Sequence, residues 1–163
     1  MKPEPLSYEM ASNRRPQQVD PFLQRVMFII DGWVEGEWEA KEAIRHEAAA
    51  LGWTPSRTAR YKDAILSSHA LAVRVDGMSE TKFRRELEKV DAPTPGELIR
   101  KARMRYAAKL LRETRLLVKQ VARRAGYDND KHFADAFRAE FNTTPSDYRK
   151  SFIARLSKAA DDT

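Results

Sequence analysis

The sequence of 163 residues contains no cysteine. This excludes disulfide bonds, thiolate metal sites and a cysteine nucleophile, and it fits the reducing conditions of a cytoplasm. Long apolar runs are also missing. The longest, residues 26–30, is far shorter than the roughly 20 residues that a membrane-spanning helix needs. No signal peptide opens the chain. These features predict a cytoplasmic protein without a membrane segment.

Patterns that carry catalysis are scarce as well. The three histidines, His46, His69 and His132, lie far apart in the sequence, and none has a partner at metal-ligand spacing. The chain has neither a glycine-rich phosphate loop nor a G-x-S-x-G motif. None of the 24 acidic residues sits in an apolar setting that suggests general acid–base work. We therefore expect no enzyme activity, no metal and no cofactor.

Positive charge is present, and it is unevenly placed. The net charge is +6 with an isoelectric point near 9.6. Residues 1–62 contain nine basic and nine acidic side chains, whereas residues 63–163 contain 21 basic and 15 acidic ones. The whole excess therefore lies in the C-terminal part. A basic domain favours an anionic partner such as nucleic acid, although a solvated surface would have the same composition.

Residues 117–141 have the pattern of a helix-turn-helix, with a further helix from residue 145. Gly126 stands where the tight turn requires a residue without a Cβ, and Asp128 or Asn129 is expected to cap the second helix. Asn142 suits a left-handed helix end, and Thr144–Pro145 starts the next helix. The predicted buried faces hold Val118, Val121, Ala122 and Ala125 on the first helix, and Phe133, Ala136, Phe137 and Phe141 on the second.

Residues 67–90 repeat this arrangement. Leu71, Ala72 and Val75 form the inner face of the first helix, Gly77 makes the turn, and Ser79 caps a second helix. Phe83 and Leu87 are predicted to face inward on that second helix. The distance from Leu87 to Pro95 equals that from Phe137 to Pro145, eight positions in each case. The two units are therefore internal repeats.

A single helix over residues 95–114 is predicted between the repeats. At ~1.5 Å per residue it is roughly 30 Å long, close to the ~34–36 Å that separates successive major grooves on one face of DNA. Arg100, Lys101, Arg105 and Lys109 are expected on its outer side. A last helix over residues 145–158 should close the core with Tyr148, Phe152, Ile153 and Leu156, and residues 158–163 should form a frayed tail.

These two repeats and their linker resemble the DNA-binding domain of the AraC/XylS family of bacterial transcription regulators. The second repeat follows the family pattern I-x-x-I-A-x-x-x-G-F and its G-x-[ST]-P-x-x-[YF]-R ending, and the linker follows R-[LM]-x-x-A-x-x-L-L. Asn142 and Ala92 replace the glycines of the two endings, and Leu87 replaces an aromatic residue. The matching residues are Val118, Val121, Ala122, Gly126, Tyr127, Phe133, Phe137, Phe141, Thr144, Pro145, Tyr148 and Arg149, with Leu98, Ile99, Arg103, Met104, Ala107, Leu110 and Leu111 in the linker.

The resemblance implies an all-α domain over residues 63–157 that binds double-stranded DNA with two major-groove recognition helices and regulates transcription, with RNA polymerase as a candidate partner. Asp135 stands where many members carry a basic residue, so the second unit either binds DNA weakly or reads cytosine. For His132 two interpretations remain open: contact with a base or phosphate, or an ordinary surface histidine. The DNA-contacting residues expected on the recognition helices are Glu80, Thr81, Lys82, Arg84 and Arg85 in the first unit, and Asp130, Lys131, His132, Ala134, Asp135 and Arg138 in the second.

The N-terminal part is expected to be a flexible arm (1–19) followed by a helical extension (20–62). The apolar spacing within residues 20–34 predicts an amphipathic helix capped by Asp20. Phe28 and Ile29 widen its apolar stripe. The acids of residues 35–42 predict the start of another helix, since a helix N-terminus favours negative charge. Residues 43–62 resemble a weak helix-turn-helix, with a packing extension as the alternative. These extra helices are additional even to the minimal form of the family, the single-domain activators.

A second class of function remains open at this point. The wide apolar face of residues 20–34 and the acidic residues 31–47 suit a homodimer contact or another protein partner. On that view the helix-turn-helix units are a degenerate scaffold with weak or no specific DNA binding.

Overall fold

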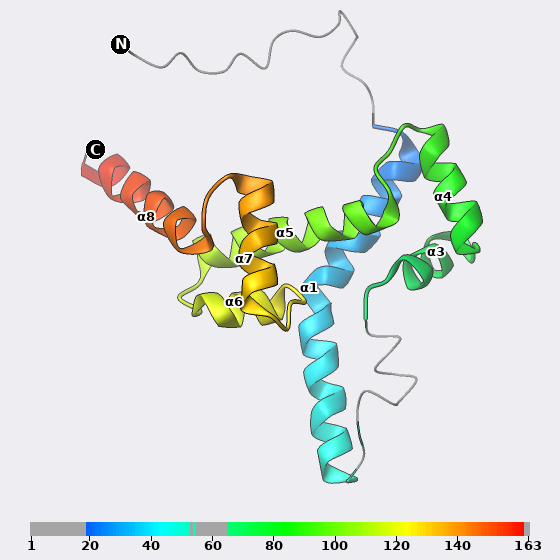
Figure 1. Cartoon of the computed structure of the whole chain (residues 1–163), viewed down its shortest axis with the longest axis horizontal. Coiled ribbons are helices and arrows are strands. Elements are labelled where there is room, and N and C mark those ends of the chain that lie inside the picture. The colour runs from blue at the N-terminus through cyan, green and yellow to red at the C-terminus, as the bar shows by residue number, and fades with distance from the viewer. Residues whose placement is uncertain (1–18, 53, 55–64, 162–163) are drawn as a thin grey trace, which may run out of the picture.

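The computed structural model describes residues 19–52, 54 and 65–161. The described residues form seven α-helices, and the predicted all-α class is confirmed. Both helix-turn-helix units and the linker helix lie where the sequence predicts them (Figure 1). The helices are α1 (Pro21–Ala50), α3 (Ser68–Asp76), α4 (Glu80–Lys89), α5 (Pro95–Glu113), α6 (Val118–Arg124), α7 (Asp130–Phe141) and α8 (Pro145–Asp161).

Helix α1 is one continuous helix of 30 residues, so the prediction of two helices in this stretch is wrong. Asp20 caps it as expected, its Oδ1 accepting from the backbone N–H of Phe22 at 2.8 Å. The acids that suggested a second start lie in mid-helix instead. Glu35, Glu37 and Glu39 pair there with basic side chains of α5 and α6, whereas Glu42 pairs with Arg45 of α1 itself. Residues 55–62 of the expected extension lie outside the described residues, as does the expected arm up to residue 18.

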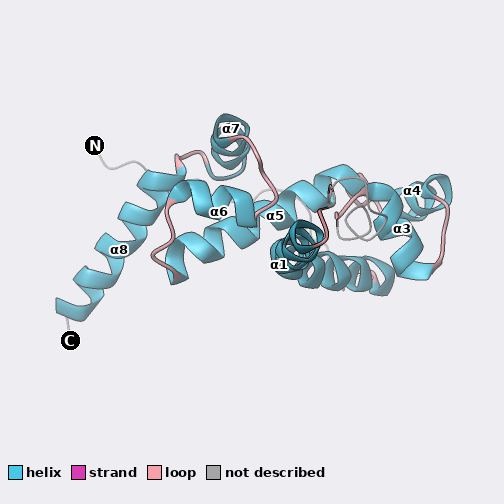
Figure 2. Cartoon of the chain, turned by 90° about the horizontal axis from the view of Figure 1, so that it is seen from below, coloured by secondary structure: helices cyan, strands magenta, loops and turns pink. Residues whose placement is uncertain are grey.

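The core consists of two clusters that meet along α5. The first joins α1, α3, α4 and the start of α5, and the second joins the rest of α5 to α6 and α7. Helix α1 packs against α5, α3 and α6. It runs behind α5 in Figure 1 and below it in Figure 2, whereas α7 lies on the other side of α5 in both views. Helix α1 therefore supports the linker from the face opposite α7.

Side-chain caps fix the helix starts. Ser79 accepts from the N–H of Lys82 at 3.3 Å, and Asn129, one of two predicted candidates, accepts from that of His132 at 3.0 Å. Thr94 and Glu97 form a capping box, and the hydrogen bonds from Thr94 lower the pKa of the Glu97 carboxyl. The contribution of the Glu97 carboxylate to this cap is therefore present at neutral pH and lost as pH falls through the lowered pKa, while the Thr94 hydroxyl still accepts from the Glu97 N–H. Asn142 adopts the predicted left-handed conformation, with φ 55°.

Helix α8 departs from its prediction at the C-terminal end. Tyr148 packs on the second core cluster as expected. Ile153 and Leu156 do not close the core, because they are 55% and 56% exposed. The helix extends away from the body (Figure 2) and continues to Asp161, so residues 158–161 are helical rather than frayed. No helix in the described ranges is both long and apolar enough to cross a membrane.

Candidate nucleic-acid interface

The first helix-turn-helix is built on a glycine turn and two buried anchors. Gly77 ends α3 in the left-handed region, with φ 62°, and this reverses the chain into α4. Phe83 and Leu87 of α4 are buried at 0% and 1% exposure. With that face fixed in the core, the opposite face of α4 must meet solvent. The predicted contact residues lie there: Thr81, Lys82, Arg84 and Arg85 are exposed, and Glu80 is half-buried.

The second unit has the same construction. Gly126 turns the chain with φ 85°, and Phe133 and Phe137 of α7 are buried at 1% and 0% exposure. Their rings belong to an aromatic cluster in which Phe137 lies 4.6 Å from Phe141 and 5.4 Å from Tyr148, measured between ring centroids. The outward face carries the predicted contact residues: Asp130, Lys131, His132, Asp135 and Arg138 are exposed, and Ala134 is half-buried.

The two outer faces differ in charge. On α4 the acid Glu80 lies 3.6 Å from Arg84, measured between carboxylate and guanidinium, and Lys82 and Arg85 add further positive charge. On α7 the acids Asp130 and Asp135 balance the basic residues. The attraction for a polyanion is therefore stronger at α4 than at α7.

Three of the four basic residues expected on the outer side of the linker helix are partly exposed, but each is held in an ion pair. Arg105 and Lys109 point toward α1, where they pair with Asp31 and Glu35, each at 2.7 Å. Hydrogen bonding to Glu35 raises the pKa of the Lys109 ammonium. Arg100 pairs with Glu140 of α7 at 3.1 Å. The sequence pattern could not reveal these pairs, because their acidic partners on α1 and α7 lie far away in the chain.

A buried ion pair was missed entirely. Glu37 of α1 is 2% exposed, and its Oε2 lies 3.0 Å from Nη2 of Arg103 on α5. The same guanidinium donates through Nη1 to the carbonyl oxygen of Gly126 at 3.0 Å. The sequence did contain a clue, since Glu37 continues the spacing of the buried apolar residues Val34 and Ile44 along α1.

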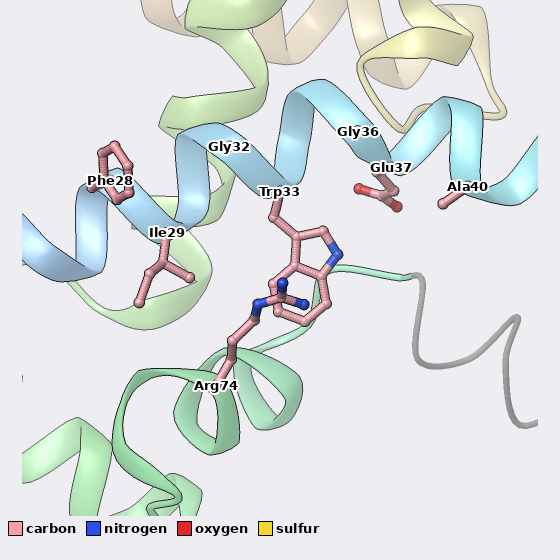
Figure 3. Close-up of a pocket in the computed structure, with 8 residues that line it drawn as sticks. All are labelled: Phe28, Ile29, Gly32, Trp33, Gly36, Glu37, Ala40 and Arg74. Atoms are coloured by element: carbon pink, nitrogen blue, oxygen red, sulfur yellow. The ribbon is translucent and has the colours of Figure 1, made fainter.

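A shallow groove of about 460 Å³ opens between α1 and α3. Phe28, Ile29 and Trp33 of α1 line it together with Arg74 of α3, as Figure 3 shows. The Arg74 guanidinium lies 4.8 Å from the centre of the Trp33 ring, within the range of a cation–π contact. Among the described residues no three His, Asp or Glu side chains gather as a metal site requires.

Comparison with known proteins agrees with this geometry. Residues 73–151, which run from α3 into α8, match the family described as a helix-turn-helix domain. A transcriptional regulator from Chromobacterium violaceum, described as an AraC-type DNA-binding domain-containing protein, superposes with a TM-score of 0.51 at 26% identity, covering 55% of this chain and 80% of its own. The protein contains an AraC-type helix-turn-helix domain.

The curated regulators of the helix-turn-helix type that match are longer than this chain. The regulator AlkR of Acinetobacter baylyi is 32% identical over 73 residues, which are 45% of this chain and 24% of AlkR. The activator RhaS of Escherichia coli is 31% identical over 88 residues, which are 54% of this chain and 29% of RhaS. The chain thus matches less than a third of the length of these relatives.

The likeness of fold extends beyond that region. A DNA-binding transcriptional dual regulator from Escherichia coli K-12 superposes with a TM-score of 0.59 at 17% identity, covering 88% of this chain and 99% of its own. The matched residues 73–151 form a smaller share of the chain than this. The shared fold therefore includes part of the N-terminal residues as well as the AraC-type domain.

Proposed function

We propose that this protein binds double-stranded DNA in a sequence-specific manner and regulates transcription, with α4 and α7 placed in major grooves. The observation that supports this best is the common construction of the two helices. Each buries a phenylalanine face, through Phe83 in α4 and Phe133 in α7, and turns a row of polar side chains to solvent. A rigid helix with an exposed polar face is what base readout in a major groove requires.

The linker supplies a suitable separation. Helix α5 has 19 residues, which at ~1.5 Å per residue span about 28 Å. Successive major grooves on one face of DNA lie ~34–36 Å apart. Helix α4 precedes α5 in the chain and α7 follows it, so a linker of this length suits two recognition helices that enter neighbouring grooves. The protein would then read two blocks of sequence about one helical turn apart.

The charges suggest different roles for the two helices. Lys82, Arg84 and Arg85 make α4 the main base reader, because an arginine or lysine can donate to the O6 and N7 acceptors of guanine. Glu80 and Thr81 border that surface. Helix α7 contributes fewer favourable contacts through Lys131, His132, Ala134 and Arg138, because Asp130 and Asp135 repel phosphates. It would mainly position the protein.

The partners follow from this role. DNA binding places the protein in the bacterial cytoplasm, and RhaS, which is named as an activator, makes RNA polymerase a reasonable second partner.

The interaction-module alternative is less well supported. Its acidic residues Asp31, Glu35 and Glu37 are engaged with basic residues of the same chain. Phe28, which is 81% exposed, remains the residue of α1 best placed for contact with a second copy.

Fluorescence anisotropy with labelled duplexes at two salt concentrations tests the proposal. A binder that neutralises several phosphates should lose roughly 0.9 log units of affinity per phosphate for each tenfold rise in salt. An excess of unlabelled random duplex should compete poorly against a selected site. Binding that ignores salt, or that random DNA removes equally well, would count against sequence-specific recognition.

A further inference from the structure

The buried face of α1 contains a carboxylate held by two cations. Glu37 Oε1 lies 2.6 Å from the ammonium of Lys41, and Oε2 lies 3.0 Å from Nη2 of Arg103. Burying such charges carries a desolvation cost, and well-packed apolar residues often stabilise a fold as well or better. Stability alone is therefore a weak reason for this pair. What the pair does provide is a fixed direction for the Arg103 side chain.

The Arg103 guanidinium in turn contacts both helix-turn-helix units. Its Nη1 donates to the carbonyl oxygen of Gly126, the turn residue between α6 and α7, at 3.0 Å. Its Nη2 donates to the carbonyl oxygen of Leu66, which directly precedes the Ser67 cap of α3, at 3.4 Å. One planar group fixed by Glu37 therefore joins the first unit, the linker and the turn that leads into α7.

Other ion pairs between α1 and the domain are exposed. Asp31 with Arg105 and Glu35 with Lys109 have side chains between 44% and 52% exposed. Exposed pairs contribute little, because water and salt screen them. They share the α1–α5 interface with Glu37 but do not reach a turn of either unit. They are therefore matched controls for the buried pair.

We propose that Glu37 is a positioning residue for DNA recognition. Acting through Arg103, it fixes the orientation of α7 relative to α4 and so sets the spacing between the two DNA blocks that the protein accepts. The part that concerns DNA rests on the proposed function. The geometric part does not, because it concerns the relative placement of two helices in the free protein.

The geometric part is tested by measuring the distance between α4 and α7. Since the chain has no cysteine, Glu88→Cys and Ala139→Cys place one spin label on each helix at exposed positions outside the predicted contacts. Pulsed electron paramagnetic resonance should give a narrow distance distribution in this background. Adding Glu37→Gln should broaden or shift it, while adding Asp31→Asn should leave it unchanged.

A second variant keeps the proposal testable if the Glu37→Gln protein does not fold. Arg103→Lys keeps a cation for Glu37, but a lysine ammonium lacks the planar fork that reaches Glu37 and Gly126 together. Far-ultraviolet circular dichroism checks that each variant is folded. The distribution should broaden in Arg103→Lys as well. Unchanged distributions in folded Glu37→Gln and Arg103→Lys would overturn the proposal.

The DNA part is tested by moving the two blocks. Inserting one base pair between them should weaken binding of the wild-type protein roughly tenfold or more, by analogy with a mismatched position. In Glu37→Gln this penalty should fall at least about threefold, while Asp31→Asn should keep it in full. An equal penalty in wild type and Glu37→Gln would overturn the proposal. If the wild type prefers no DNA sequence, the proposed function fails, and the spin-label distances decide the geometric part alone.

Discussion

Arg103 lies so close to Gly126 that a side chain at position 126 would displace its guanidinium. The guanidinium donates to the Gly126 carbonyl at 3.0 Å, and a Cβ built on Gly126 would lie 2.6 Å from Nη1 of Arg103. The backbone of Gly126 also has φ 85°, a region that L side chains rarely adopt. The turn into α7 is therefore defined by a steric and a conformational requirement together.

Replacing Gly126 by alanine should lower the free energy of unfolding more than the same change at Gly77. Gly77 also has a positive φ, 62°, but nothing lies within 4 Å of its hypothetical Cβ. Gly77→Ala should thus cost only the left-handed backbone, ~1–2 kcal/mol, and Gly126→Ala should cost that plus the displacement of Arg103. Urea unfolding of both variants measures the difference. Equal losses of unfolding free energy in the two variants would show that the Arg103 side chain moves aside at no free-energy cost.

Substitutions of Arg85 and Arg105 should distinguish a side chain that reads bases from one that belongs to a structural ion pair. Arg85 is exposed on α4, whereas Arg105 pairs with Asp31 on α1. Arg85→Ala should relax base preference at one position by ~1–3 kcal/mol. Arg105→Ala should leave sequence preference intact and change affinity little on any sequence. Binding to a panel of single-base variants of the selected site distinguishes them. Loss of preference in Arg105→Ala alone would reverse the assignment.

Removing the charge of Asp135 should strengthen DNA binding. The side chain is exposed on the outer face of α7, where a carboxylate facing phosphates repels them. Asp135→Asn should therefore raise affinity on all sequences, and most at low salt, since salt screens the repulsion. Anisotropy titrations at two salt concentrations test this. A selective loss of affinity for sites with cytosine at one position would instead identify Asp135 as a base reader.

Phe137 should be essential for the second unit. It is fully buried and lies at the centre of the cluster with Phe133, Phe141 and Tyr148. Phe137→Ala should cost ~3–5 kcal/mol through lost burial and the cavity left behind. Thermal unfolding followed by circular dichroism measures this. Phe28→Ala is the control, because Phe28 is 81% exposed and its removal should change stability little. Similar losses in the two variants would contradict the described core.

The helices of the AraC-type domain could be predicted because their information is local. Apolar spacing identified the buried faces of α4 and α7, and short-range caps such as Ser79 and Asn129 marked their starts. Gly77, Gly126 and Asn142 marked the turns, since all three adopt positive φ. Repeated spacing then related the two units to each other.

The errors concern contacts between residues far apart in the chain. Glu35 suggests a helix start when only its neighbours are considered, but Lys109, 74 positions away, is what holds it. The ion pair between Glu37 and Arg103 was missed for the same reason, because 66 positions separate the two residues in the chain. Ile153 and Leu156, in the C-terminal half of α8, have core-like periodicity without a surface to cover them in the described structure. Such features depend on packing and not on sequence pattern.

Selection of bound duplexes from a random DNA library tests the central claim most directly. The account predicts an enriched motif of two blocks about one helical turn apart, with the α4 block more strongly defined than the α7 block. The Arg85→Ala protein, selected in parallel, should lose definition within the α4 block only. A library that remains random after repeated selection would contradict sequence-specific recognition by this protein.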